Sequence, residues 1–340
     1  MTYTDVLTNA KKNMAPVCRV CRECNGVACR GEIPGVGGKG SGSAFTRNCE
    51  QLAKIKINMD LIYEDRGQDP STELFGHKFA APVFAAPISG LSTNYNGYLN
   101  EKTYAEALVP GCMKAGCAAF TGDGAPDHFL KDPLPAVKAA GGIAVPTVKP
   151  WNGDTLREKM DLIKKSGAMA MAMDIDAAGL PLLAAAGKPV CSKGVAELSK
   201  IAAYAERPFI LKGIMTQVGA IKAIECGAYG IVVSNHGGRV IDHTPATIEM
   251  LPEIKKIVGD KIKIFIDGGF RTGIDVFKAL ALGADAVLIG RPYVVAACGG
   301  GEEGVMLYTQ KIISELKDTM KMTGCASLKD ITSDKIQILN

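Results

Sequence analysis

Short apolar runs alternate with longer amphipathic stretches along most of the chain. Each run is rich in β-branched or small apolar residues and has the length of a strand that is buried on both faces. The stretches between them, such as residues 154–165 and 273–282, have the length and the polar face of surface helices. Eight strands separated by helices predict one (β/α)8 barrel, the TIM-barrel class, and not an open sheet. The predicted strands are residues 82–87, 118–121, 143–148, 168–175, 208–214, 230–234, 263–267 and 286–290.

Polar residues follow several of these runs directly, at the strand ends where barrel enzymes carry their reactive groups. Lys212 stands inside an apolar run. Burying an unpaired ammonium there would be unfavourable, so we expect an anionic partner. His236 follows the sixth run, and imidazole is well suited to take a hydroxyl proton near neutral pH. The sequence therefore predicts an active site that contains both residues.

The last two strand ends have the features of a phosphate site. Such a site needs backbone amides, a helix amino terminus and a cation that can form paired hydrogen bonds. Residues 267–271, Asp-Gly-Gly-Phe-Arg, and Gly290-Arg291 supply all three. Their predicted position matches the usual phosphate position of this barrel.

These segments resemble the FMN-dependent 2-hydroxy-acid oxidases and dehydrogenases, the family of the lactate and glycolate oxidases. The matching segments are Lys-Gly-Ile at 212–214, Ser-Asn-His-Gly-Gly-Arg at 234–239 and Asp-Gly-Gly-Phe-Arg-Thr-Gly at 267–273. The resemblance covers roughly residues 45–338 and is strongest over 208–292. It implies that a lactate-like 2-hydroxy acid is oxidised by hydride transfer to N5 of FMN.

The resemblance implies a role for each matching residue. His236 would be the base, Asp176 the carboxylate that pairs with it, Arg239 the cation for the substrate carboxylate, and Lys212 the cation at the flavin edge. A homo-oligomer, commonly a four-fold tetramer of barrels, is also implied. The other implied FMN contacts are Ala86, Pro87, Ser89, Thr121, Asp174, Ser234, Asp267, Gly268, Gly269, Arg271, Gly290 and Arg291.

The substrate side departs from the family pattern. Pro146 stands where the family has a flavin-contacting Gln, Val148 where it has a Tyr, and Asp174 where it has a Thr. The segment 177–183 offers no counterpart of the family's second carboxylate-binding Arg, and the lid between Asp176 and Lys212 is short. Lys149 is a candidate replacement cation. FMN binding is compatible with these changes, whereas the identity of the substrate stays open.

Two other functions therefore stay open. An FMN-dependent isomerase of the type 2 isopentenyl-diphosphate isomerase kind would share the barrel, although the intact motif at 234–239 argues against it. A flavin and iron–sulfur dehydrogenase with a different substrate is the other. The sequence does not distinguish oxygen from another electron acceptor.

Four cysteines lie close together near the N-terminus, at Cys18, Cys21, Cys24 and Cys29. Four thiolates at this spacing can bind zinc or an iron–sulfur cluster, and a metal-free thiol cluster is the alternative. The array is not part of the family pattern. The other seven cysteines are dispersed, and we predict that they are small core residues.

A Gly-rich stretch at residues 31–43 is predicted to form a turn or flap across the barrel mouth. We therefore expect residues 1–50 to form a Cys- and Gly-rich extension that caps the barrel, and residues 51–340 to form the barrel itself.

Composition narrows the range of partners. A chain of 340 residues with 47% hydrophobic and 22% charged residues can bury one large core. The net charge of +4 is mild and its Lys and Arg are scattered, which argues against a nucleic-acid partner. No apolar run reaches the length of a membrane span, and the N-terminus lacks a signal-peptide core. We therefore expect a cytoplasmic protein that acts on a small molecule.

Overall fold

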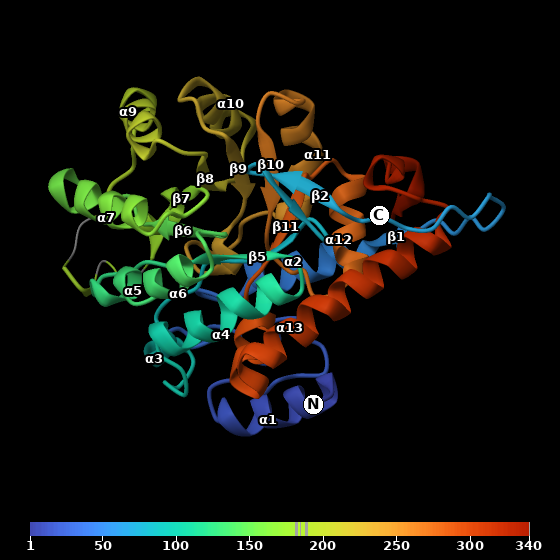
Figure 1. The fold of residues 1–340 in the computed structure, drawn as a ribbon, viewed down its shortest axis with the longest axis horizontal. Coiled ribbons are helices and arrows are strands. Elements are labelled where there is room, and N and C mark those ends of the chain that lie inside the picture. The colour runs from blue at the N-terminus through green and yellow to red at the C-terminus, as the bar shows by residue number, and fades with distance from the viewer. Residues whose placement is uncertain (181–182, 184, 188–189, 340) are drawn as a thin grey trace.

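Eight parallel strands close into a barrel at the centre of the molecule (Figure 1). The computed structural model describes residues 1–180, 183, 185–187 and 190–339. Neighbouring strands follow the order β10-β11-β4-β5-β6-β7-β8-β9. The predicted fold class is confirmed, and each predicted strand is present, several with shorter ends. The strands are β4 (Val83–Ala85), β5 (Ala118–Thr121), β6 (Ala144–Val148), β7 (Met171–Asp174), β8 (Phe209–Ile214), β9 (Gly230–Val233), β10 (Lys263–Ile266) and β11 (Ala286–Ile289).

Helices surround the barrel, as the connecting stretches predict (Figure 1). None of the helices in the described part of the chain is both long enough and apolar enough to cross a membrane. Their bounds are α1 (Tyr3–Asn13), α2 (Ser43–Lys54), α3 (Leu91–Asn94), α4 (Glu101–Lys114), α5 (His128–Lys131), α6 (Leu134–Ala139), α7 (Gly153–Lys165), α9 (Val195–Ala205), α10 (Gln217–Glu225), α11 (Thr247–Val258), α12 (Gly273–Ala281) and α13 (Arg291–Met322).

Alternate residues of each strand fill the barrel interior, as the period of two requires. Phe84, Phe120 and Phe265 are fully buried there and meet edge to face. The antiparallel hairpin of β2 (Thr72–Leu74) and β3 (His77–Phe79) packs Phe75 against Phe265 at the amino ends of the strands. Because this end is filled by aromatic side chains, the opposite end is left for a ligand.

The N-terminal region shares the core of the barrel. Helix α1 packs against α13, and Met14 and Val36 belong to the main buried cluster. The boundary expected at residue 50 falls inside α2, while β1 (Ile55–Ile57) pairs with β12 (Ile336–Ile338). Five of the seven dispersed cysteines are buried, as predicted. Cys49 is half-buried, and the prediction is wrong for Cys191, which is exposed next to the loop after β6.

Candidate active site

A cavity of about 350 Å3 opens at the carboxyl ends of the strands. Its wall includes three of the four predicted catalytic residues, His236, Lys212 and Arg239. Thr121, Ser234 and Asp176 do not line it, but each is adjacent to a lining residue along the chain or through a hydrogen bond. The predicted FMN contacts on the wall are Ala86, Pro87, Ser89, Asp174, Lys212, Asp267, Gly268, Gly269, Arg271, Gly290 and Arg291.

The register of the barrel places buried charges side by side. Asp174 of β7 is the direct neighbour of Lys212 of β8, and the Lys212 Nζ lies 3.4 Å from Asp174 Oδ1 and 3.4 Å from Asp267 Oδ2. Burial alone would lower the pKa of Lys212, but Asp267 and Asp174 hold this pKa above its ordinary value. The buried ammonium therefore has anionic partners, as the sequence predicts.

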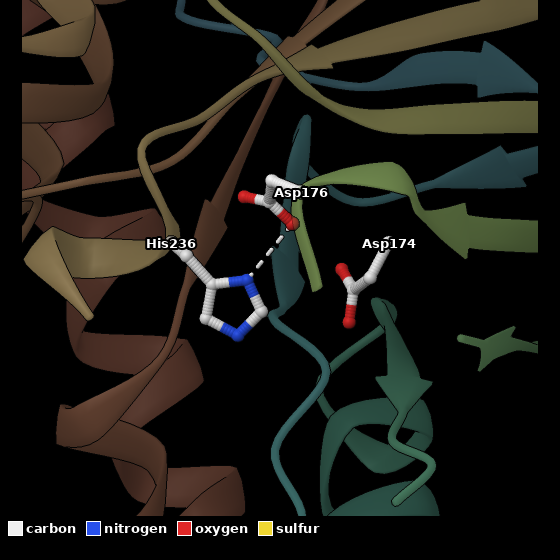
Figure 2. Close-up of side chains that lie close together, drawn as sticks. All are labelled: Asp174, Asp176 and His236. Carbon is white, nitrogen blue, oxygen red and sulfur yellow. Dashed lines mark hydrogen bonds and ion pairs between the residues drawn. The ribbon is translucent and has the colours of Figure 1, made fainter. Parts of the chain in front are cut away.

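His236 is held by contacts at its ring and at its backbone. Its Nδ1 lies 3.0 Å from Asp176 Oδ1, and its backbone N–H donates to Ser234 Oγ over 3.0 Å. The same Ser234 oxygen accepts a hydrogen bond from Lys212 Nζ. Figure 2 shows the Nδ1 edge of the imidazole facing Asp176, with the other ring nitrogen directed away from this carboxylate. The pairing implied by the family resemblance is therefore present in the geometry.

A carboxylate partner defines the protonation of this ring. Because an ionised carboxylate can only accept, the neutral ring that fits this contact is the tautomer with its hydrogen on Nδ1, which leaves the Nε2 lone pair free. His236 has a positive φ of 56°, an uncommon conformation for a residue with a side chain. This local geometry is typical of functional residues that the surrounding structure holds in place.

Gly213 gives Asp176 the space that it occupies. A Cβ at Gly213 would lie 2.6 Å from the Cβ and Cγ of Asp176, and the backbone there has a φ of +103°. We expect Gly213→Ala to push Asp176 away from His236 and to lower turnover about 10- to 100-fold, because catalytic geometry tolerates little displacement. Steady-state kinetics of the FMN-loaded protein measure this loss.

Gly227→Ala is the matched control for Gly213→Ala. Gly227 also has a left-handed backbone, with a φ of +77°, but nothing lies within 4 Å of an added Cβ. Both variants carry backbone strain, whereas only Gly213→Ala displaces the carboxylate. Equal turnover in the two variants would contradict the role given to Asp176.

Three arginines of the cavity wall are held by main-chain carbonyls of the N-terminal region. Arg239 donates to the carbonyls of Gly35 and Gly37, and Arg291 donates to those of Val36 and Gly37. Arg271 donates to the Cys24 carbonyl. Among the described residues, no carboxylate forms an ion pair with these three guanidinium groups. Burial and the neighbouring Arg291 lower the pKa of Arg239 to about 10.

The glycines at the same end of the cavity allow close backbone approach. Gly268 and Gly269 have φ values of +100° and +88°, and a Cβ at Gly269 would lie 2.7 Å from the Asn48 carbonyl oxygen. Helix α13 begins at Arg291, so its amino terminus faces this region. Arginines without carboxylate partners, glycines and a helix amino terminus together favour a bound anion.

The polar atoms of the cavity fit FMN. Asp267 Oδ1 and Thr121 Oγ1 are buried and have no hydrogen-bond partner among the described residues, and such orphan polar atoms indicate a missing partner. Hydroxyl groups of a ribityl chain and a flavin ring would supply donors there. Arg271, Arg291 and the α13 amino terminus would hold the phosphate. The residues present therefore fit a phosphorylated flavin.

The sulfur atoms of the four-cysteine array are not all within metal-ligand distance of one another in the described residues. One group of three or more ligand atoms within 4.8 Å of one another occurs among them, and it consists of Asp174, Asp176 and His236. The array lies outside regular secondary structure between α1 and α2, with Cys21 exposed and the other three thiols half-buried. Whether these thiols bind a metal or cluster stays a prediction.

Sequence reasoning missed several residues of the wall, among them Asn94 and Tyr95. Asn94 ends α3, and its Oδ1 accepts hydrogen bonds from Arg239 Nη2 and the Gly35 N–H. Tyr95 follows it and also lines the cavity. The segment after β4 has no periodicity and no charged residue to mark it, so only the fold reveals its place beside Arg239.

Together the fold and the site fit a barrel enzyme whose cavity would hold a phosphorylated flavin next to a His–Asp pair. The chain belongs to the FMN-dependent dehydrogenase family, whose model matches residues 36–182 and 189–338. The family resemblance seen in the sequence motifs is thereby confirmed, and FMN is the cofactor that names the family.

Named proteins that are similar to this chain support its membership of this family. An L-lactate oxidase of Lacticaseibacillus rhamnosus is 32% identical over 91% of this chain and 90% of its own length. A peroxisomal (S)-2-hydroxyacid oxidase of Arabidopsis thaliana is 47% identical over 135 residues, which cover 40% of this chain and only 37% of that protein. A mandelate oxidase mutant with an FMN adduct superposes with a TM-score of 0.74 and 28% identity over 88% of this chain and 93% of its own.

Proposed function

We propose that this protein oxidises a small, lactate-like 2-hydroxy acid with FMN as its electron acceptor. The observation that carries the proposal is the hydrogen bond between His236 Nδ1 and Asp176 Oδ1 at a cavity that also exposes Lys212 and arginines. Oxidising a hydroxylated carbon requires a base for the hydroxyl proton, and this pair supplies one. The named relatives act on 2-hydroxy acids or lactate according to their names, which supports the same substrate class.

His236 and Asp176 would perform the proton transfer. Asp176 accepts the Nδ1 hydrogen, so the Nε2 lone pair can take the substrate hydroxyl proton, and the carboxylate then stabilises the imidazolium that forms. The chemistry that FMN would supply when bound is acceptance of the two electrons and the hydrogen that leave the substrate carbon. Lys212 would hold the charge that reduction places on the cofactor edge.

Arg239 would bind the substrate carboxylate. Its described hydrogen bonds, to Gly35 O, Gly37 O and Asn94 Oδ1, engage three of the five N–H donors of a guanidinium. The remaining donors are available to a carboxylate on the cavity side. The family's second carboxylate-binding arginine has no counterpart in the sequence of residues 177–183. Of these residues, Pro181 and Leu182 lie outside the described part of the chain.

An activity assay with product analysis tests this proposal. We expect the FMN-loaded protein to convert L-lactate to the 2-oxo acid, with oxygen or an artificial dye accepting the electrons. Conversion of another 2-hydroxy acid in place of lactate would keep the reaction class and change the substrate. Consumption of no 2-hydroxy acid would contradict the proposal and would favour the isomerase or the dehydrogenase with a different substrate.

We further propose that the Cys18, Cys21, Cys24 and Cys29 thiols bind zinc or an iron–sulfur cluster. The Cys24 carbonyl lies 3.0 Å from Arg271 Nε, which supports a connection between this segment and the phosphate end of the site. The sulfur atoms would have to move closer together than they are. Iron with acid-labile sulfide in anaerobically purified protein would support a cluster and a dehydrogenase, whereas absence of both iron and zinc would contradict the proposal.

The remaining assignments belong to the same proposal. A homo-oligomeric and commonly tetrameric assembly is expected by family resemblance, and a cytoplasmic location and oxygen or another electron acceptor stay predictions. The N-terminal region would act as a cap on the barrel, which its carbonyl contacts to Arg239, Arg271 and Arg291 support.

A further inference from the structure

Lys149 forms a buried ion pair with Asp174 beside the predicted flavin edge. Its Nζ lies 2.6 Å from Asp174 Oδ2, and the side chains of the two residues are 6% and 2% exposed. Val148 of β6 pairs with Met173 of β7, so the register sets Lys149 next to Asp174, and Asp174 next to Lys212. The three charges thus occupy consecutive strand ends of the barrel.

These charges form a balanced set with Asp267. Lys212 contacts both Asp174 and Asp267, while Lys149 contacts Asp174. These two ammonium and two carboxylate groups have a net charge of zero among themselves, and the His236–Asp176 pair lies beside them in every variant considered. Without Lys149, Lys212 would face two carboxylates alone and the set would carry one negative charge. Because charges interact strongly in a buried site, this difference would act on any group bound against Lys212.

A second buried pair nearby is separate from this set. Asp123 accepts from Lys159 Nζ, Trp151 Nε1 and the backbone N–H groups of Lys149 and Gly124. Its carboxylate is therefore already paired with Lys159, and the Lys149 ammonium is directed to Asp174. Burial would raise the pKa of Asp174, but Lys149 and Lys212 hold it below its usual range, so Asp174 is ionised.

We propose that Lys149 is a positioning residue that acts through Asp174 to set the net charge at the flavin edge, and thereby how readily bound FMN takes electrons. The inference rests on the proposed function, because it requires FMN bound against Lys212.

Reduction potentials of three variants test the inference. Lys149→Met adds one net negative charge and should shift the equilibrium between oxidised and reduced FMN at least tenfold toward the oxidised form. Asp174→Asn adds one net positive charge and should shift it at least tenfold toward the reduced form. Tenfold corresponds to about 30 mV for a two-electron couple. The double variant restores neutrality and should lie close to the unmodified protein.

Two further variants separate charge from structure. Lys149→Arg keeps the charge and should keep the potential. Lys159→Met breaks the equally buried pair with Asp123 and should lower the melting temperature while shifting the potential less than Lys149→Met does, because Asp123 does not contact Lys212. If Lys149→Met fails to fold, Lys149→Gln makes the same charge change with a polar side chain. The free energy of unfolding of the FMN-free proteins gives an independent readout. The double variant should lose less of this free energy than the sum of the losses in the two single variants.

The outcomes separate this inference from the proposed function. Shifts of the same sign in both single variants, or no shift in either while FMN stays bound, would overturn the role of Lys149. An unmodified protein that binds FMN but oxidises no 2-hydroxy acid would overturn the proposed function and leave the potentials measurable. Opposite shifts that cancel in the double variant are the result that we expect.

Discussion

Replacement of His236 by alanine is expected to lower turnover with a 2-hydroxy acid by about 10²- to 10⁴-fold, the usual effect of removing a positioned base. The imidazole lies on the cavity wall with its Nδ1 bound to Asp176, so no other described side chain takes over this geometry. FMN should stay bound, because the predicted phosphate and ribityl contacts come from Asp267, Arg271 and Arg291. Turnover and the FMN content of the purified variant are the measurements.

His77→Ala is the control for this variant. His77 is exposed in β3, at the amino ends of the strands and away from the cavity. Its removal should leave turnover unchanged. A His236→Ala protein that holds FMN and turns over at the unmodified rate would exclude His236 as the base. Loss of FMN from this variant would show that the histidine also supports the cofactor site.

Replacement of Lys212 by methionine is expected to lower turnover by at least 10²-fold, as removal of a preorganised electrostatic group does. The ammonium lies between two buried carboxylates, Asp174 and Asp267, at 3.4 Å from each. Its loss leaves Asp267 without this partner and should lower the free energy of unfolding by about 3–5 kcal/mol. Denaturant titration and turnover of the FMN-loaded protein measure the two effects.

Lys222→Met provides the comparison for Lys212→Met. Lys222 is exposed on α10, so its replacement should change neither turnover nor stability. The account of the buried charges would be wrong if Lys212→Met were as stable and as active as Lys222→Met. A loss of stability with full turnover would restrict Lys212 to a structural role.

Much of the fold follows from the sequence because the barrel repeats one pattern. Each strand is a short apolar run, and each strand end exposes its next residue to the same cavity. That rule is enough to bring Lys212, His236 and Asp267 together before any coordinates are known. Asp176 follows from the same rule with the help of the family resemblance.

The contacts of the N-terminal region could not be predicted in this way. Residues 14–42 lack the hydrophobic period of a helix or a strand. The carbonyls of Gly35 and Gly37 accept hydrogen bonds from Arg239, which lies more than two hundred positions further along the chain. The Lys149–Asp174 pair is missed for a related reason. It depends on the register between β6 and β7, which apolar runs of similar composition do not specify.

The absorbance spectrum of the FMN-loaded protein under anaerobic conditions, recorded before and after addition of L-lactate, tests the central claim most directly. The account predicts that the oxidised-flavin bands bleach on addition of the substrate, and that they persist in His236→Ala. Flavin bands that stay unchanged with L-lactate and with other 2-hydroxy acids would contradict the proposed reaction. A protein that binds no FMN when the cofactor is supplied would contradict the account of the site itself.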